Sequence, residues 1–229
     1  MADLQALLTA SAARHSHLCP RQVLGVRAGL AGINALGFTI PITDKRLLVI
    51  VETDGCFTDG IEVATGSTVG HRTLRVEDYG KIAATFVNIL TEEALRLYPK
   101  LDVRQRAGEY APEYAPDNES VESEHYYAQL QAYQSMPENE LFNINEIELA
   151  IPLEKIISRP GVRIDCDYCG EEIINEREVY RNGFTLCRAC AGPAYYIDVQ
   201  NHKQAIFSIR PSSAKPPNQA TPENPLPGT

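Results

Sequence analysis

Four cysteines in two close pairs constrain this chain more than any other feature of its sequence. Two residues separate Cys166 from Cys169 and Cys187 from Cys190, and seventeen residues lie between the pairs. A two-residue gap lets both thiolates turn onto one ion, and two such pairs complete a tetrahedral site with no open position. The pattern therefore predicts one structural zinc ion. Rubredoxin-type iron and two redox CxxC pairs are the alternatives.

The segment between the two cysteine pairs predicts a β-hairpin. Asn182-Gly183, a dipeptide that favours tight turns, lies between the strand-like stretches 178–181 and 184–186. Gly170 follows the first pair, where the backbone must turn sharply to point its amides at the sulfurs. This is the layout of a zinc ribbon or a treble clef. Because acidic and basic residues are mixed in it, we expect it to serve folding, dimerisation or protein contact rather than nucleic acid binding.

Length and charge argue against a secreted, membrane-spanning or nucleic-acid-binding protein. Six cysteines could form three disulfides, but a chain of 229 residues without an export signal, with four cysteines in pairs, favours metal. The net charge of −9 opposes binding to nucleic acid phosphates and to anionic membranes. No apolar run approaches the roughly 18 residues that span a bilayer. We therefore expect a cytoplasmic protein.

Helical and strand patterns come in mixed order before the cysteine pairs, which predicts an α+β core with a mixed or antiparallel sheet and packed helices. The segment Thr91–Tyr98 is open between helix and strand. The predicted helices are Asp3–Arg14, a run from Cys19-Pro20 that stops at Gly37, Thr58–Thr65 and Glu119–Gln134. The predicted strands are Leu47–Glu52, Thr73–Val76, Lys81–Leu90 and Asn143–Ile151.

The predicted boundaries divide the chain into three parts. The α+β core is expected over residues 1–157, the four-cysteine zinc finger over 158–207, and a disordered, proline-rich tail over 208–229. An insertion at about 107–136 is unusually acidic. From Ala107 to Glu148 there are ten acidic residues and no Lys or Arg. We interpret this segment as a solvated insertion, with a binding surface for a basic partner as the alternative.

The other two cysteines lie at predicted helix starts in the core. Cys19 is at or next to the N-cap of one helix, and Cys56 follows a strand and opens another. Free N–H groups and the helix dipole there stabilise thiolates, which makes each thiol a better nucleophile or metal ligand. With His15, His17 and Asp59 nearby, converging helices would form a mixed site with an open position. The alternative is a pair of ordinary buried cysteines with surface histidines.

Two motifs stand out in the core: His15-x-His17-Leu18-Cys19-Pro20 followed by Leu24–Gly29, and Glu52-x3-Cys56-x2-Asp59-Gly60-Ile61 with the loop Thr65–Gly70. Together they resemble the E-subunit family of formylmethanofuran dehydrogenase. Residues 78–84 and the C-terminal cysteines fit the same family, and the resemblance covers about residues 10 to 190. It implies an α+β core, a treble-clef-like zinc finger and a dimeric assembly.

The resemblance also implies a core site around His17, Cys19 and Cys56, with Asp59 as a further ligand. The family takes its name from a molybdenum or tungsten enzyme that reduces carbon dioxide onto methanofuran, and many relatives look like stand-alone proteins. Ser67 stands where many members have Cys, so this chain offers two thiols there rather than three.

Several other residues have two interpretations each. The loop Gly66–Gly70 is interpreted as a turn, with an anion cradle built from its backbone N–H groups as the alternative. Arg27 would pair with a carboxylate or bind an anionic ligand. His71 and Lys81 would lie on the surface or face the cleft of the core site.

Three functions remain open at this point. The first is a metal-binding protein accessory to redox or one-carbon metabolism, with structural zinc, a second transition metal at the core site, and a homodimeric or metalloenzyme partnership. The second is a zinc-stabilised protein-interaction module without catalysis. The third is a thiol-dependent enzyme that uses Cys19 or Cys56 as nucleophile and His17 as base. Hydrolase motifs such as GxSxG and HExxH are absent from the sequence.

Overall fold

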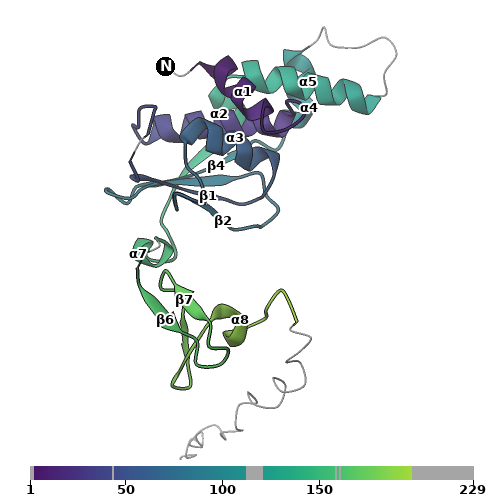
Figure 1. Cartoon of the computed structure of the whole chain (residues 1–229). Coiled ribbons are helices and arrows are strands. Elements are labelled where there is room, and N and C mark those ends of the chain that lie inside the picture. Colours follow the sequence, from purple (N-terminus) through teal and green to yellow (C-terminus); the bar gives the residue numbers. More distant parts are fainter. Residues whose placement is uncertain (1–2, 43, 112–120, 158, 160, 198–229) are drawn as a thin grey trace, which may run out of the picture. The chain divides into compact units, whose positions relative to one another are not determined.

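The computed structural model describes residues 3–42, 44–111, 121–157, 159 and 161–197, with the backbone alone for 121–124 (Figure 1). The predicted tail, 208–229, lies outside the described residues. Contacts divide the chain into two units, Met1–Ser158 and Arg159–Thr229. No described helix is both long enough and apolar enough to cross a membrane.

The first unit is built on one mixed sheet in the order β2-β1-β3-β4-β5. β1 pairs with β2 in parallel, and the pairs β1–β3, β3–β4 and β4–β5 are antiparallel. This confirms the predicted α+β class. The strands are β1 (Leu47–Val51), β2 (Leu74–Val76), β3 (Ala84–Asn88), β4 (Ala94–Pro99) and β5 (Phe142–Ile147), and the helices are α1 (Leu4–Ala12), α2 (Pro20–Ala35), α3 (Cys56–Thr65), α4 (Val103–Tyr110), α5 (Val121–Ser135), α6 (Glu138–Leu141) and α7 (Leu153–Ile156).

The main core lies between the sheet and the helices α1 to α5, which gather on one face of it (Figure 1). Alternate residues of β1 point to opposite faces, so Leu47, Val49 and Val51 join this core. Leu48 joins a smaller cluster with Leu153 of α7. The sheet is therefore apolar on both faces, which accounts for the continuous aliphatic run of β1.

The segment that the sequence left open, Thr91–Tyr98, contains strand β4. Its residues pair with β3 through a tight connection, with Phe86 opposite Leu95 and Ala84 opposite Leu97. Leu97 is fully buried. Its packing against the helices outweighs the local preference of these residues for a helix, so the segment forms a strand. Helix α4, which the sequence patterns did not predict, follows directly after β4.

Two glycines let α2 and α3 cross at very short range. A Cβ atom at Gly25 would lie 2.1 Å from the carbonyl oxygen of Phe57, and one at Gly60 would lie 2.4 Å from the carbonyl oxygen of Gln22. No side chain fits at either position. Both glycines lie within two turns of their helix starts, so the crossing brings the N-termini of α2 and α3 together.

The second unit consists of two hairpins and a short helix. Strand β6 (Arg163–Asp165) pairs with β7 (Glu172–Ile174), β8 (Val179–Arg181) pairs with β9 (Phe184–Leu186), and α8 spans Arg188–Ala191. Asn182 and Gly183 both have positive φ, 51° and 84°, as the predicted two-residue hairpin turn requires.

Candidate metal centre and cysteine-lined cleft

Cys166, Cys169, Cys187 and Cys190 bring four sulfurs together in the second unit. All four ligand atoms lie within 4.8 Å of one another. Tetrahedral coordination by thiolates at about 2.3 Å from zinc requires sulfurs about 3.8 Å apart, so a small inward movement accommodates an ion. The first pair lies in the β6–β7 hairpin and Cys187 caps α8. Because the second pair begins a helix, the module follows the treble-clef-like alternative.

Backbone amides already point at these sulfurs. The N–H of Cys187 donates to Cys166 Sγ at 3.2 Å, and the N–H of Cys190 donates to Cys187 Sγ at 3.4 Å. Gly170, with φ of 74°, makes the turn that closes the first pair. Such amide donors stabilise thiolate charge, which is the state that binds metal.

The thiols differ in how readily they ionise. Burial raises the pKa of Cys166, but amide donors from Cys169, Cys187 and Tyr168 outweigh it and lower that pKa to about 6. Burial and neighbouring thiols raise the pKa of Cys190. Four thiols in such contact carry full negative charge only beside a cation. The donor set, the spacing and the amide donors therefore all fit a metal ion.

In the first unit, the structure brings Cys19 and Cys56 together. Cys19 is the N-cap of α2, where its sulfur accepts from the N–H of Gln22 at 3.4 Å and the Gln22 side chain accepts from the N–H of Cys19 at 2.9 Å. Cys56 is the first residue of α3. The two thiols are neighbours, and the Cys56 thiol helps to raise the pKa of Cys19. The crossing of α2 and α3 at the two glycines thus places both sulfurs at one site.

Burial is the main reason that the pKa of Cys19 lies above its usual 9.0. The same surroundings raise the pKa of Tyr126, first through burial and then through the charge of the two thiols. The Tyr126 hydroxyl donates to the carbonyl oxygen of Leu18 at 3.2 Å. Helix α5 therefore covers the thiol pair with a tyrosine.

The other predicted members of the core site have different partners. His15 Nε2 lies 2.6 Å from Asp59 Oδ2, and Arg14 lies 3.7 Å from the same carboxylate. His17 Nδ1 lies 3.0 Å from the hydroxyl of Ser16. Within the described part of the chain, the C-terminal cysteines are the one group of three or more His, Cys, Asp or Glu with ligand atoms this close. Among the described residues of the core site, the structure therefore brings the two thiols together and, separately, pairs His15 with Asp59.

Cys19 and Cys56 line a cleft of about 1280 Å³ between the starts of α2 and α3, the end of β4, and helices α4 and α5. At its edge, Arg96 of β4 makes two hydrogen bonds to the carboxylate of Glu52, at 2.5 and 2.7 Å. Glu52 is only 7% exposed, and the pair raises the pKa of Arg96. A buried carboxylate held in this way fixes the end of β1 from which the chain leads to Cys56.

Arg27 follows neither of its two predicted interpretations. Its guanidinium donates to the carbonyl oxygens of Tyr133, Gln134 and Met136 at 2.8 to 3.0 Å. These are the unpaired carbonyls at and just beyond the C-terminus of α5, where a cation is favoured. Burial lowers the pKa of Arg27. It is therefore a structural group that joins α2 to α5.

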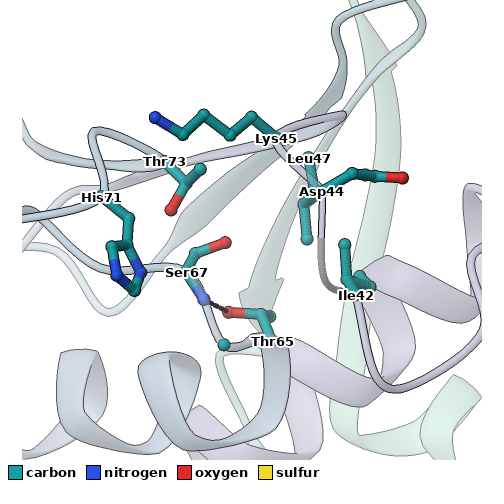
Figure 2. Close-up of a pocket in the computed structure, with 9 residues that line it drawn as sticks. Ile42, Asp44, Lys45, Leu47, Thr65, Ser67, His71 and Thr73 are labelled. Carbon is teal, nitrogen blue, oxygen red and sulfur yellow. Dashed lines mark hydrogen bonds between the residues drawn. The ribbon is translucent and has the colours of Figure 1, made fainter.

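The loop Gly66–Gly70, which we interpret as a turn rather than as an anion cradle, has amides that are largely occupied by partners within the protein. The N–H of Ser67 donates to Thr65 Oγ1 at 3.1 Å, as Figure 2 shows, and the N–H of Thr68 donates to Thr73 Oγ1 at 3.0 Å. Thr68 Oγ1 in turn accepts from the N–H of His71. The turn borders a separate pocket of about 440 Å³, which His71 also lines (Figure 2). Lys81, in contrast, lines the cysteine cleft.

Sequence reasoning missed most of the cleft. Its cationic lining beyond Lys81 comes from three elements or their ends, α2, β4 and α4, and carries no motif. Arg104 belongs to α4, which was not predicted, and Arg96 belongs to the segment left open. The only signal was charge, since the acidic segment leaves the rest of the chain close to neutral. The missed cations are Arg21, Arg96, Lys100 and Arg104.

Comparison with known proteins places these features in a family. The family model described as "FmdE, Molybdenum formylmethanofuran dehydrogenase operon" matches residues 14–143. A "Probable S-adenosyl-L-methionine-binding protein" of Archaeoglobus fulgidus is 31% identical over 204 residues, which cover 80% of this chain and 52% of that protein. The chain therefore spans about half the length of that curated relative.

Among solved structures, a tungsten formylmethanofuran dehydrogenase FmdE-like protein from Syntrophus aciditrophicus superposes with a TM-score of 0.53. The match has 17% sequence identity and covers 85% of this chain and 95% of that chain. At this identity the likeness concerns the fold. The match of the family model to more than half of the chain, over both core cysteines, shows that this protein belongs to the FmdE family.

Proposed function

We propose that this protein is a metal-binding accessory protein of redox or one-carbon metabolism, with a structural zinc ion in the C-terminal module and a second, thiophilic metal at Cys19 and Cys56. The observation that carries the second part is the contact of two thiols from helices 37 positions apart in sequence. The link to formylmethanofuran dehydrogenase operons that the family description prints supports the metabolic setting.

The two thiols would provide two ligands and leave other positions open. His17 lies two residues before Cys19 and would be the third ligand, whereas Asp59 supports the site less because His15 and Arg14 already bind its carboxylate. An open, partly solvated dithiolate suits a metal that is exchanged or that meets a substrate, in contrast with a closed structural site.

A metal site is favoured over a thiol nucleophile by the protonation of Cys19. Burial keeps the pKa of this thiol above 9.0, so little thiolate exists at neutral pH. A bound metal ion would displace the proton and stabilise the charge. The enzyme that uses Cys19 as a free nucleophile is therefore the weaker candidate.

Binding of S-adenosyl-L-methionine is not transferred to this chain. The Archaeoglobus fulgidus protein that carries this name is about twice as long as the matching segment. The cysteine cleft is also lined by five Lys or Arg side chains, which repel a sulfonium cation.

Elemental analysis of the purified chain tests the proposal. The wild type is expected to hold zinc plus a second metal, and Cys19→Ser/Cys56→Ser to retain about one zinc per chain while losing the second metal. Cys187→Ser is the matched control, because it should lose zinc and retain the core metal. Equal metal content in the wild type and the double variant would refute the core site. A visible absorption band typical of ferric thiolate would show that the C-terminal module holds iron rather than zinc.

The homodimer also belongs to this proposal. Sedimentation velocity of the full chain tests it directly: a mass of twice 25.3 kDa would support it, and a mass of 25.3 kDa at all concentrations would refute it.

A further inference from the structure

The cysteine cleft is cationic in a protein that is acidic overall. Five Lys or Arg side chains line it, and no acidic residue is among the described residues that do so. The net charge of the chain is −9. A positively charged cleft in a negatively charged protein concentrates the positive electrostatic potential there, which attracts an anionic ligand. The five are Arg21, Lys81, Arg96, Lys100 and Arg104.

Three of these five cations, Arg21, Lys81 and Arg104, have no carboxylate counter-charge among the described residues, whereas the charge of Lys100 helps to lower the pKa of Glu140. Arg96 is bound by Glu52, but no described Asp or Glu lies within ion-pair distance of Arg21, Lys81, Lys100 or Arg104. Lys81 lies 5.9 Å from the ring centroid of Tyr79 and makes no ion pair in the described part of the chain. Side chains of like charge that converge without counter-charges repel one another, and a bound anion relieves that repulsion.

The rest of the lining suits an organic compound. Leu24, Ile82 and three tyrosines supply apolar and aromatic surface between the cations. The volume, about 1280 Å³, far exceeds that of one inorganic anion and leaves room for an organic compound. The cations converge around a concave cleft from separate segments, whereas binding along a nucleic acid needs an extended basic stripe. The three tyrosines are Tyr98, Tyr126 and Tyr133.

We propose that this cleft binds a phosphorylated organic compound that carries two or more negative charges. Arg21, Lys81 and Arg104, which have no carboxylate counter-charge among the described residues, match a multiply charged phosphate group, whereas a single carboxylate would leave most of them uncompensated. These cations hold the phosphate, and the remainder of the compound contacts the tyrosines and the two thiols that line the same cleft. The inference deepens the proposed function, since the two thiols lie in the same cleft, and it rests on that function only for the role of the thiols.

Calorimetric titration with ADP, pyrophosphate and adenosine on the full chain tests the inference. Pyrophosphate carries the charge of ADP and adenosine carries its ring. We expect ADP to bind more tightly than pyrophosphate, and adenosine not to bind measurably. Arg104→Ala should weaken ADP binding about tenfold, as removal of a charged hydrogen bond does. Lys45→Ala is the matched control, because it removes an exposed cation outside the cleft and should leave the affinity within about twofold.

Three outcomes would overturn the inference: no binding of either phosphate compound, an equal loss of affinity in Arg104→Ala and Lys45→Ala, or tighter binding of an oligoglutamate peptide than of ADP with the same dependence on Arg104. The last would make the cleft a docking site for an acidic protein segment. Circular dichroism confirms that both variants fold. Metal content reports the thiol pair and ADP affinity reports the cations, so failure of the proposed function and failure of this inference are distinguishable.

Discussion

The two groups of cysteines in this protein are built by opposite means. The four C-terminal sulfurs come from one segment of 25 residues, in which two hairpins and a helix start hold them within 4.8 Å. The thiols of Cys19 and Cys56 come from two helices, and they meet because Gly25 and Gly60 allow those helices to cross. The first group gathers four thiols, whereas the second gathers two thiols that open into a cationic cleft.

The difference shows that the four-cysteine cluster and the module around it form together, whereas the pair of Cys19 and Cys56 depends on a core that folds around it. The buried hydrophobic cluster of the second unit contains only Cys166, Ile173 and Leu186 among the described residues. That is too little apolar surface to stabilise a module without metal. The thiol pair, in contrast, lies beside the large cluster between helices and sheet, which needs no ion to form.

The largest effect that would separate the two sites is the removal of metal. Chelation, or Cys187→Ser, should unfold residues 161–197 while the first unit keeps its structure. Structural zinc contributes an apparent free energy of about 10–16 kcal/mol in comparable small modules. Hydrogen exchange of the two units measures this. Unchanged amide protection in the module after complete chelation would contradict the dependence.

Next in size is the effect of a side chain at the helix crossing. Gly60→Ala should destabilise the first unit by about 3 kcal/mol, because a Cβ there would meet backbone atoms at 2.4 and 2.6 Å. Urea denaturation measures the free energy of unfolding. Gly108→Ala is the control, since nothing lies within 4 Å of a Cβ at this position of α4, and it should be neutral or stabilising. A neutral Gly60→Ala would mean that the crossing tolerates separation.

A smaller loss of stability is expected when the ion pair between Arg96 and Glu52, beside the cleft, is broken. Arg96→Met leaves the carboxylate of Glu52 buried without its partner, and should cost about 2 kcal/mol because Arg96 itself is partly solvated. Arg46→Met breaks an exposed pair with Asp44 and should cost much less, because exposed ion pairs contribute little to stability. Thermal unfolding compares the two. Equal losses would show that burial of Glu52 carries no penalty.

The smallest effect concerns the reactivity of Cys19. In metal-free Cys56→Ser protein, alkylation of Cys19 by iodoacetamide should be half-maximal above pH 9.0. The thiolate is the reactive form, and burial, which remains in this variant, is the largest cause of the raised pKa. At pH 8 the rate should therefore lie several-fold below that of free cysteine. Mass spectrometry of the Cys19 peptide across pH gives the profile, and a midpoint below 9.0 would contradict the burial argument.

Local pattern was enough wherever the structure is made by neighbours in sequence. The CxxC spacing and the Asn182-Gly183 turn predicted the C-terminal cluster, because both depend on backbone geometry within a few residues. The long aliphatic run of β1 and the capped start of α2 were predicted for the same reason. Boundaries moved by a few residues, as at α3, which begins at Cys56 rather than Thr58.

What the sequence alone determined is thus the family, the α+β class and the four cysteines that form the C-terminal cluster. Tertiary structure alone decided that Thr91–Tyr98 contributes a strand, that Arg27 caps α5, and that Asp59 pairs with His15. It also decided that Cys19 meets Cys56 in a cleft lined by cations from separate segments. These outcomes depend on which buried surfaces pack together, and the free energy of such packing comes from contacts between residues far apart in the chain, which no local spacing records.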